Sequence, residues 1–330
     1  MKLIVQIPCY NEEAALAETL RDIPRTVPGF ERVEVLVVDD GSDDRTVEVA
    51  HSAGSDHVVR HRRNRGLAHA FRTGLDAALA LGADVIVNTD ADHQYEGRDI
   101  PALVAPILAG RADMVVGDRQ THRLAHFSRT KRFLQWLGSA LVRRLSGLDV
   151  PDAVSGFRAF SREAALRLNV LSTFSYTIET LIQAGRSRMA VAVVPVAARP
   201  TRRRSRLFRS LPQFLERSLV TMVRVYTMYH PLRVFVLLGS LLSLAGLVPI
   251  VRWLFFYFHG QGGGHLQSLV LGAALLVIGF VMLLVGLVAD LIAFNRMLVE
   301  ETLEKVRALS TASAAKAESA GVERSARDTS

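Results

Sequence analysis

The stretch Ala83-Asp84-Val85-Ile86-Val87-Asn88-Thr89-Asp90-Ala91-Asp92 joins a short apolar run to two carboxylates one residue apart. The apolar run is typical of a buried strand, and acidic side chains at the end of such a strand are costly to leave bare. A hard divalent cation would neutralise them and could also hold the phosphates of a nucleotide. The spacing alone favours a solvated acidic turn, so the choice depends on the rest of the chain.

Apolar runs alternate with helical patterns from Lys2 to about residue 120. We predict strands over 3–7, 33–38, 58–59, 85–87, 114–117 and 191–197, and helices over 13–23, 46–53, 66–81 and 100–108. Such alternation predicts an α/β fold with a mostly parallel sheet covered by helices on both faces. Ligands bind such sheets beyond the carboxyl ends of the strands.

Three polar clusters lie at those predicted strand ends. They are Pro8 with Tyr10-Asn11-Glu12, Asp39-Asp40-Gly41-Ser42, and Asp90-Ala91-Asp92. Because the carboxyl ends of parallel strands meet at one edge of a sheet, we expect these clusters to lie close together. Their convergence favours a binding site over an acidic turn.

Composition and charge narrow the class of partner. The chain has 330 residues, 49% of them hydrophobic, and a formal net charge of +8. A basic balance favours anionic partners, which include nucleic acid, phosphorylated substrates and an anionic membrane face. Cys9 is the single cysteine, which excludes an intrachain disulfide and a cysteine-based zinc cluster. Met1-Lys2 runs directly into a short apolar stretch without a secretory signal, so we expect the N-terminal portion in the cytosol.

The C-terminal half has the pattern of a membrane hairpin. Residues 234–251 and 267–289 contain no charged side chain and are each long enough to span a bilayer. An aromatic belt over 253–258 follows the first span. Arginines cluster over 199–209, before the first span, so the positive-inside rule places both ends of the hairpin in the cytosol.

These patterns divide the chain into four parts. We predict an α/β domain over 1–206, amphipathic helices in the membrane interface over 207–232, and two transmembrane helices over 233–296. The fourth part, 297–330, is predicted to be cytosolic, with a short helix over 300–309 and then a disordered polar tail.

Six short motifs occur in order along the chain: Ile7-Pro8-Cys9-Tyr10-Asn11-Glu12-Glu13, Val38-Asp39-Asp40-Gly41-Ser42, Asn64-Arg65-Gly66 with Ala70 and Gly74, Asp90-Ala91-Asp92-His93-Gln94, Gly117-Asp118-Arg119 and Asp152-Ala153-Val154-Ser155-Gly156-Phe157-Arg158. Together they resemble the motifs of family 2 glycosyltransferases with the GT-A fold, a Rossmann-like α/β domain. The last two narrow the resemblance to dolichol-phosphate mannosyltransferase-like enzymes, which use polyprenyl phosphate as acceptor. The resemblance covers residues 1 to about 210, and the two-span hairpin fits the bacterial and archaeal members.

The resemblance implies a role for each motif. Asp90, Asp92 and Gln94 would hold Mg²⁺ or Mn²⁺, and Asp92, Asp152 and Arg119 would be catalytic. The nucleotide would lie against Pro8, Tyr10, Asn11, Glu12, Asp39, Asp40, Asn64, Gly66, Asp90 and Ala91. The acceptor phosphate would be bound by Arg119, Arg132, Arg199, Arg202, Ser205 and Arg206.

Three positions leave alternatives open. Asp152 could instead cap a helix or pair with Arg158. His93 stands where family members often carry an apolar residue, so it has no implied role. Arg203-Arg204 stand near the place of a usual glycine, which leaves the geometry of that loop open.

The residues themselves agree with a lipid-phosphate acceptor. Such a phosphate is already anionic and needs little help from a general base. The catalytic demand is then positioning and charge neutralisation. Direct attack on the anomeric carbon of a GDP-mannose or UDP-glucose type donor would invert its configuration, and the sequence leaves the sugar and base open.

We considered other functions for the chain. A processive polysaccharide synthase usually carries a Gln-x-x-Arg-Trp segment and more spans than this chain has. A membrane-anchored inactive scaffold would not need to retain Asp39, Asp90, Asp92 and Gln94. Nucleic-acid binding would also use the positive charge, but the arginine cluster adjoins the spans, so lipid headgroups are the better partner. The family often associates through its membrane helices, so a homo-oligomer is among the expected partners.

Overall fold

The computed structural model describes residues 1–120, 139–140, 142–144, 146–170, 176–199, 220, 223–224, 226–228 and 230–328. Contacts divide the chain into two units. One contains Met1–Thr221 and Thr302–Ser330, and the other contains Met222–Glu301. We describe each unit by itself, and the predicted four-part division stays a prediction.

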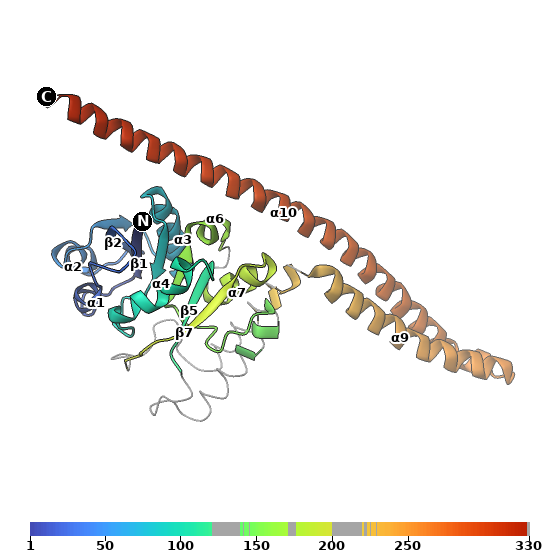
Figure 1. Cartoon of the computed structure of the whole chain (residues 1–330). Coiled ribbons are helices and arrows are strands. Elements are labelled where there is room, and N and C mark those ends of the chain that lie inside the picture. The colour runs from blue at the N-terminus through green and yellow to red at the C-terminus, as the bar shows by residue number, and fades with distance from the viewer. Residues whose placement is uncertain are drawn as a thin grey trace. The chain divides into compact units, whose positions relative to one another are not determined.

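The first unit is built on a seven-stranded sheet with the order β3-β2-β1-β4-β6-β5-β7. Strands β1, β2, β5 and β7 are labelled in Figure 1. Its strands are β1 (Lys2–Cys9), β2 (Arg32–Asp39), β3 (His57–Arg60), β4 (Val85–Asn88), β5 (Met114–Asp118), β6 (Arg158–Ser161) and β7 (Val191–Pro195). Its helices include α1 (Leu16–Asp22), α2 (Thr46–Ser52), α3 (Leu67–Ala80), η1 (Gly97–Asp99), α4 (Ile100–Leu108), α6 (Arg162–Arg167) and α7 (Tyr176–Arg186). The predicted GT-A-like fold with a mostly parallel sheet is confirmed.

Strand β6 is the exception to the parallel order. It runs antiparallel to both of its neighbours, β4 and β5. The sequence did not predict it, because Arg158-Ala159-Phe160-Ser161 is too short for a period-two pattern to stand out. Since β6 is reversed, its first residue, Arg158, lies opposite Asn88, the last residue of β4. The segment that precedes β6 therefore reaches the same edge as the carboxyl ends of the parallel strands.

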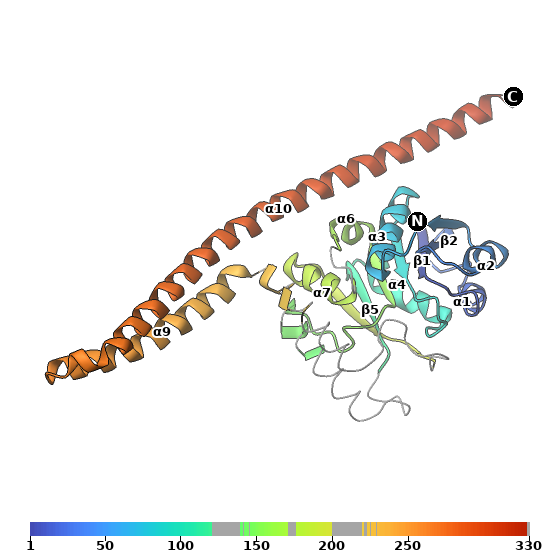
Figure 2. The ribbon, with the colours of Figure 1, turned by 180° about the vertical axis from the view of Figure 1, so that it is seen from behind.

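Helices cover both faces of the sheet because side chains alternate along each strand. On one face, Leu3, Val5 and Ile7 of β1 join a core that also contains buried residues of α1 and α4. On the other face, Phe71 of α3 stacks on Tyr176 of α7 with ring centroids 3.9 Å apart. The layering can be followed in Figures 1 and 2.

The second unit is a helical hairpin of α9 (Pro231–Phe258), the short η2 (Gly262–His265) and the first part of α10 (Leu266–Asp328). The segments Pro231–Phe258 and Gly262–Leu309 have mean hydropathies of 2.5 and 2.8 in their most apolar windows, which is enough to cross a membrane by length and composition. The two spans predicted from the sequence lie within them.

Glycines allow α9 and α10 to approach closely. A Cβ atom built on Gly239 would lie 2.8 Å from the carbonyl oxygen of Gly279, and one built on Gly246 would lie 2.9 Å from that of Gly272. Small residues at helix contacts are how apolar helices pack when no water drives them together. The same pairs therefore fix the register of the hairpin.

Helix α10 continues to Asp328, where the sequence predicted a short helix and then a disordered tail. The segment over 312–320 contains five alanines together with Lys316 and Glu318. These are among the strongest helix formers, and they outweigh the polar composition on which the prediction of disorder rested.

Candidate active site

The clusters that the sequence singled out meet at one edge of the sheet. Cys9 of β1 lies opposite Asp39 of β2, and Gln6 of β1 lies opposite Asn88 of β4. The Asp90-Ala91-Asp92 segment therefore leaves the sheet beside the ends of β1 and β2. The reversed strand β6 adds the Asp152–Phe157 segment to the same edge.

Asp90 and Asp92 are two partly buried carboxylates in one electrostatic environment. The pKa of Asp90 is raised to about 7, because burial and, after it, the charge of Asp92 outweigh the opposite effect of Arg119 and Arg158. Burial also raises the pKa of Asp92, although the Gln94 backbone N–H, 3.1 Å from Oδ1 of Asp92, lowers it. Two carboxylates that resist ionisation together are a place where a cation would be stabilising.

The residues at this edge fit a hard divalent ion. Asp90, Asp92 and Gln94 supply carboxylate and amide oxygens, which Mg²⁺ and Mn²⁺ prefer. Nη1 of Arg119 donates to Oε1 of Gln94 over 3.3 Å, which orients that amide. Within the described residues there is no group of three or more His, Cys, Asp and Glu that could hold a metal. The set fits an ion that shares its coordination with substrate phosphates.

Arg119 and Asp152 form a buried two-bond ion pair. Nε of Arg119 lies 2.7 Å from Oδ2 of Asp152, and Nη2 lies 2.9 Å from Oδ1. The two side chains are 12% and 1% exposed. Burial lowers the pKa of Arg119, but Tyr95, Asp152 and Asp90 together raise it above its usual range. The sequence left open a helix cap or a pair with Arg158 for Asp152. The structure gives Asp152 a different partner, Arg119.

Arg158 holds the segment before β6 in place. Its side chain is fully buried and donates to the carbonyl oxygens of Ser155 and Ala153, each over 2.8 Å, and to that of Thr177 over 2.7 Å. It also donates to Oγ1 of Thr180 over 2.6 Å. Burial lowers the pKa of Arg158 to about 10. Arg158 is part of the last sequence motif, but its positioning role could not be predicted from that motif.

Two more residues hold the same segment in place, and neither of them had a role predicted from the sequence. The Tyr95 hydroxyl accepts from the Gly156 backbone N–H over 3.1 Å. The Asn88 amide donates to the Gly156 carbonyl oxygen over 2.8 Å. A Cβ atom built on Gly156 would lie 2.8 Å from both carboxylate oxygens of Asp90. Glycine thus lets the segment approach Asp90. Asn88 could have been suspected from its place at the end of β4, whereas no pattern pointed to Tyr95.

Two of the predicted nucleotide-binding residues, Asp39 and Asp40, are buried and bind the backbone or side chains of neighbouring loops. Asp40 is buried and accepts from the backbone N–H groups of Arg65 and Gly66 over 2.9 and 2.8 Å, so it folds the 61–66 loop. Asp39 is fully buried, accepts from the Ser42 N–H and pairs with Arg60 at 3.1 Å.

The remaining residues of this set lie at the end of β1, in the segments that follow β1 and β4, and in the 61–66 loop. Asn11 has a φ of 54° and accepts from the Asp43 N–H over 2.9 Å, while its own N–H donates to Ser42. Pro8 and Ala91 are buried, Tyr10 is half-buried and Asn64 is exposed. Glu12 is 9% exposed, and its N–H donates to Thr46.

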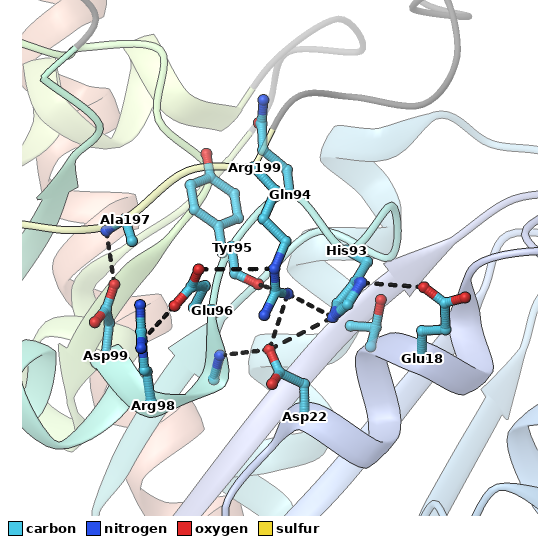
Figure 3. A network of polar contacts seen from close by, with 12 residues as sticks. Glu18, Asp22, His93, Gln94, Tyr95, Glu96, Arg98, Asp99, Ala197 and Arg199 are labelled. Atoms are coloured by element: carbon cyan, nitrogen blue, oxygen red, sulfur yellow. Dashed lines mark hydrogen bonds and ion pairs between the residues drawn. The ribbon is translucent and has the colours of Figure 1, made fainter. Parts of the chain in front are cut away.

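The predicted acceptor-phosphate residues are only partly described. Arg132, Arg202, Ser205 and Arg206 lie outside the described residues. Arg119 lies at the site as stated. Arg199 lies beside His93 and Asp22, in the network of Figure 3. Most of the predicted interface segment over 207–232 is likewise outside the described part of the chain.

A family model and several known proteins match this chain. The model of the family described as "Glycosyl transferase family 2" matches residues 4–168. An uncharacterised protein of Methanocaldococcus jannaschii is 34% identical over 200 residues, which span 59% of this chain and 80% of that protein. An undecaprenyl-phosphate mannosyltransferase of Micrococcus luteus is 28% identical over 204 residues, spanning 59% of this chain and 82% of the other.

A solved structure shows a similar fold. It is glucosyl-3-phosphoglycerate synthase of Mycobacterium tuberculosis in complex with Mn²⁺, UDP and glucosyl-3-phosphoglycerate. The TM-score is 0.53 at 25% identity, with 68% of this chain and 79% of the other covered.

Proposed function

Because the chain belongs to glycosyl transferase family 2, we propose that it transfers a sugar from a nucleotide-sugar to polyprenyl phosphate and inverts the anomeric configuration. One observation carries the proposal: the acidic pair Asp90 and Asp92 lies at the same sheet edge as the Arg119–Asp152 pair. That edge belongs to a chain with two helices apolar enough to cross a membrane. Relatives named as undecaprenyl- and dolichol-phosphate mannosyltransferases support the acceptor class.

The donor half of the reaction uses the acidic pair. Asp90, Asp92 and Gln94 would hold Mg²⁺ or Mn²⁺, as solved relatives with bound Mn²⁺ suggest. Such an ion supplies Lewis-acid stabilisation of the leaving nucleoside diphosphate. Asp39 and Asp40 shape the loops around the nucleotide, where a carboxylate can accept from a base N–H or a ribose hydroxyl. The choice between a GDP-mannose and a UDP-glucose type donor belongs to this proposal and is decided by experiment.

The acceptor half uses the positive charge of Arg119. An attacking phosphate oxygen is already ionised, so the protein has to position it and balance its charge. Asp152 fixes the Arg119 guanidinium through two bonds, so that the remaining N–H groups face a defined direction. We assign Asp152 to holding Arg119, because its own carboxylate is 1% exposed and already paired. The predicted phosphate residues Arg132, Arg202, Ser205 and Arg206 complete the proposal.

We propose a membrane location for this reaction. Helices α9 and α10 would cross the bilayer, with the catalytic domain and C-terminus in the cytosol, as the arginines before the first span imply. The acceptor's phosphate would then arrive at the cytosolic face, where basic side chains attract anionic lipids. Association of copies through these helices is part of the same proposal.

Product analysis tests the function. The full-length protein in detergent or vesicles is supplied with polyprenyl phosphate and radiolabelled GDP-mannose, UDP-glucose or UDP-N-acetylglucosamine, with Mn²⁺ or Mg²⁺. We expect one lipid-linked monosaccharide, lost with EDTA and in Asp92→Ala. The control Asp149→Ala changes a carboxylate that is 90% exposed and should retain activity.

Three results would contradict parts of the proposal. Products longer than one sugar would favour a processive synthase. Absence of product with every donor would favour an inactive scaffold. Transfer that survives both EDTA and Asp92→Ala would remove the metal from the mechanism.

A further inference from the structure

We propose that one face of α1, together with Arg199, positions the loop that carries Asp92 and Gln94, so that Arg199 acts on metal binding and not on the acceptor phosphate. The inference rests on the proposed metal site. It concerns residues that neither the family motifs nor the functional assignment above uses: Glu18, Thr19 and Asp22 on α1.

Three contacts from α1 reach the loop in succession. Oγ1 of Thr19 donates to the carbonyl oxygen of Ala91 over 3.0 Å. Oε2 of Glu18 lies 3.3 Å from Nδ1 of His93. Oδ2 of Asp22 lies 3.5 Å from the other ring nitrogen of His93. Figure 3 shows His93 between the two acidic side chains.

The same carboxylate of Asp22 extends the contact beyond the loop. Its Oδ2 accepts from the Gly97 backbone N–H over 2.9 Å and pairs with Nη1 of Arg199 at 3.1 Å. Burial raises the pKa of Asp22, but the Gly97 N–H and Arg199 lower it overall. Asp22 is therefore a point where the segment after the loop and the segment after β7 are joined to α1.

Arg199, which follows β7, contacts both the loop and Asp22 of α1. Its backbone N–H donates to the carbonyl oxygen of Gln94 over 2.8 Å. Its guanidinium contacts Asp22, Nε2 of His93 and, at 3.7 Å, Oε1 of Glu96. In Figure 3 this guanidinium lies among these acidic side chains. Two carboxylates near one guanidinium reduce its capacity to bind a further anion.

The loop needs such support because its backbone is unusual. His93 has a φ of 57°, a left-handed conformation that few residues other than glycine adopt without local contacts. His93 stands between Asp92 and Gln94, so a change in its conformation would redirect both ligand side chains. The contacts of His93 with Glu18, Asp22 and Arg199 hold this conformation. Outer contacts of this kind commonly set the affinity of a metal site.

The test measures metal binding and catalysis separately in the full-length protein. Binding of Mn²⁺ in the presence of GDP or UDP is followed by electron paramagnetic resonance of the free ion, and acceptor KM is measured at saturating Mn²⁺. We expect Arg199→Gln and Asp22→Asn each to weaken Mn²⁺ binding by about 10-fold. The acceptor KM should stay unchanged, and Arg199→Lys should recover part of the affinity.

Two further variants separate positioning from misfolding. Thr19→Val removes only the hydroxyl that reaches Ala91 and should weaken Mn²⁺ binding with an unchanged melting temperature. Arg98→Gln is the matched control, because Arg98 is 75% exposed and pairs only with Glu96 among the described residues. It should bind Mn²⁺ as the wild type does. In the double variant Asp22→Asn/Arg199→Gln, the loss of affinity should be smaller than the product of the two single losses.

The outcomes distinguish this inference from the proposed function. A raised acceptor KM with unchanged Mn²⁺ binding in Arg199→Gln would overturn the positioning role and support the predicted phosphate contact. Multiplicative losses in the double variant would also overturn it, and so would a wild-type protein that binds no Mn²⁺. Weakened Mn²⁺ binding in the variants, in a protein that transfers no sugar, would support the positioning role while the proposed function failed.

Discussion

The variant Gly156→Ala tests how closely the segment before β6 must approach the acidic pair. The new Cβ would lie 2.8 Å from both carboxylate oxygens of Asp90 and 2.9 Å from the hydroxyl oxygen of Tyr176. Tyr176 is held on both sides, by stacking on Phe71 and by a hydrogen bond from Asn88 over 2.8 Å. Asp90 is the less confined neighbour, so we expect its carboxylate to move.

The expected effects on stability and rate follow if the carboxylate of Asp90 moves and the ring of Tyr176 does not. Overpacking of a buried site costs about 1–3 kcal/mol, and each kcal/mol lowers the melting temperature of a domain of this size by roughly 2–4 °C. Displacement of a reacting or ligand group by about 1 Å costs on the order of 100-fold in rate. We therefore expect kcat/KM for the donor to fall by about 10- to 100-fold while the fold persists.

The assay combines thermal unfolding with initial rates of lipid-linked product at several Mn²⁺ concentrations. Gly263→Ala is the control, because a Cβ there meets nothing within 4 Å. A Gly156→Ala protein with wild-type kcat/KM would refute the claim that this glycine sets the position of Asp90. A protein that loses both stability and activity in proportion would show that the effect is one of folding.

Four other changes have defined outcomes. Asp152→Ala leaves the buried Arg119 without its partner and should lower the free energy of unfolding by about 3 kcal/mol in chemical denaturation. Asp40→Ala removes the acceptor of two loop N–H groups and should raise the donor KM more than it changes the acceptor KM. Burial raises the pKa of Glu34, but hydrogen bonds from Lys2 and His57 lower it overall from 4.5. The stability advantage over Glu34→Gln should therefore be present above that value and disappear as the pH falls below it in urea titrations. Gly279→Leu should separate α9 from α10, since a Cβ there already lies 2.8 Å from the Gly239 carbonyl oxygen, and proteolysis of the hairpin in vesicles should then increase.

The parallel strands could be predicted because each is a continuous apolar run that ends in polar residues. β1, β2 and β4 have buried residues on both faces, and this composition is visible in the sequence without knowledge of their neighbours. The position of the Asp90-Ala91-Asp92 segment followed from the same pattern. The reversal of β6 could not be predicted in this way, because strand direction depends on pairing with β4 and β5.

The site residues differ in how much of their role a sequence can show. Asp92 and Gln94 were found from their motif, since ligand chemistry depends mainly on residue type. The roles of Arg158 and Arg199 were not, because each depends on partners far along the chain. Arg158 contacts Thr177 and Thr180, and Arg199 contacts Asp22, 177 residues earlier. The cation of Arg158 is satisfied by carbonyl oxygens, a pairing that no charge pattern indicates.

The reversed direction of β6 has a consequence for how such enzymes can diversify. The chain leaves the sheet after Asp118 and returns at Arg158 on the same edge. A segment whose two ends are adjacent can be lengthened or exchanged at small entropic cost, since each doubling of loop length costs only about 0.6 kcal/mol. The sequence between Arg119 and Asp152 can thus change in length while the Arg119–Asp152 pair and Gly156 keep their places at the sheet edge.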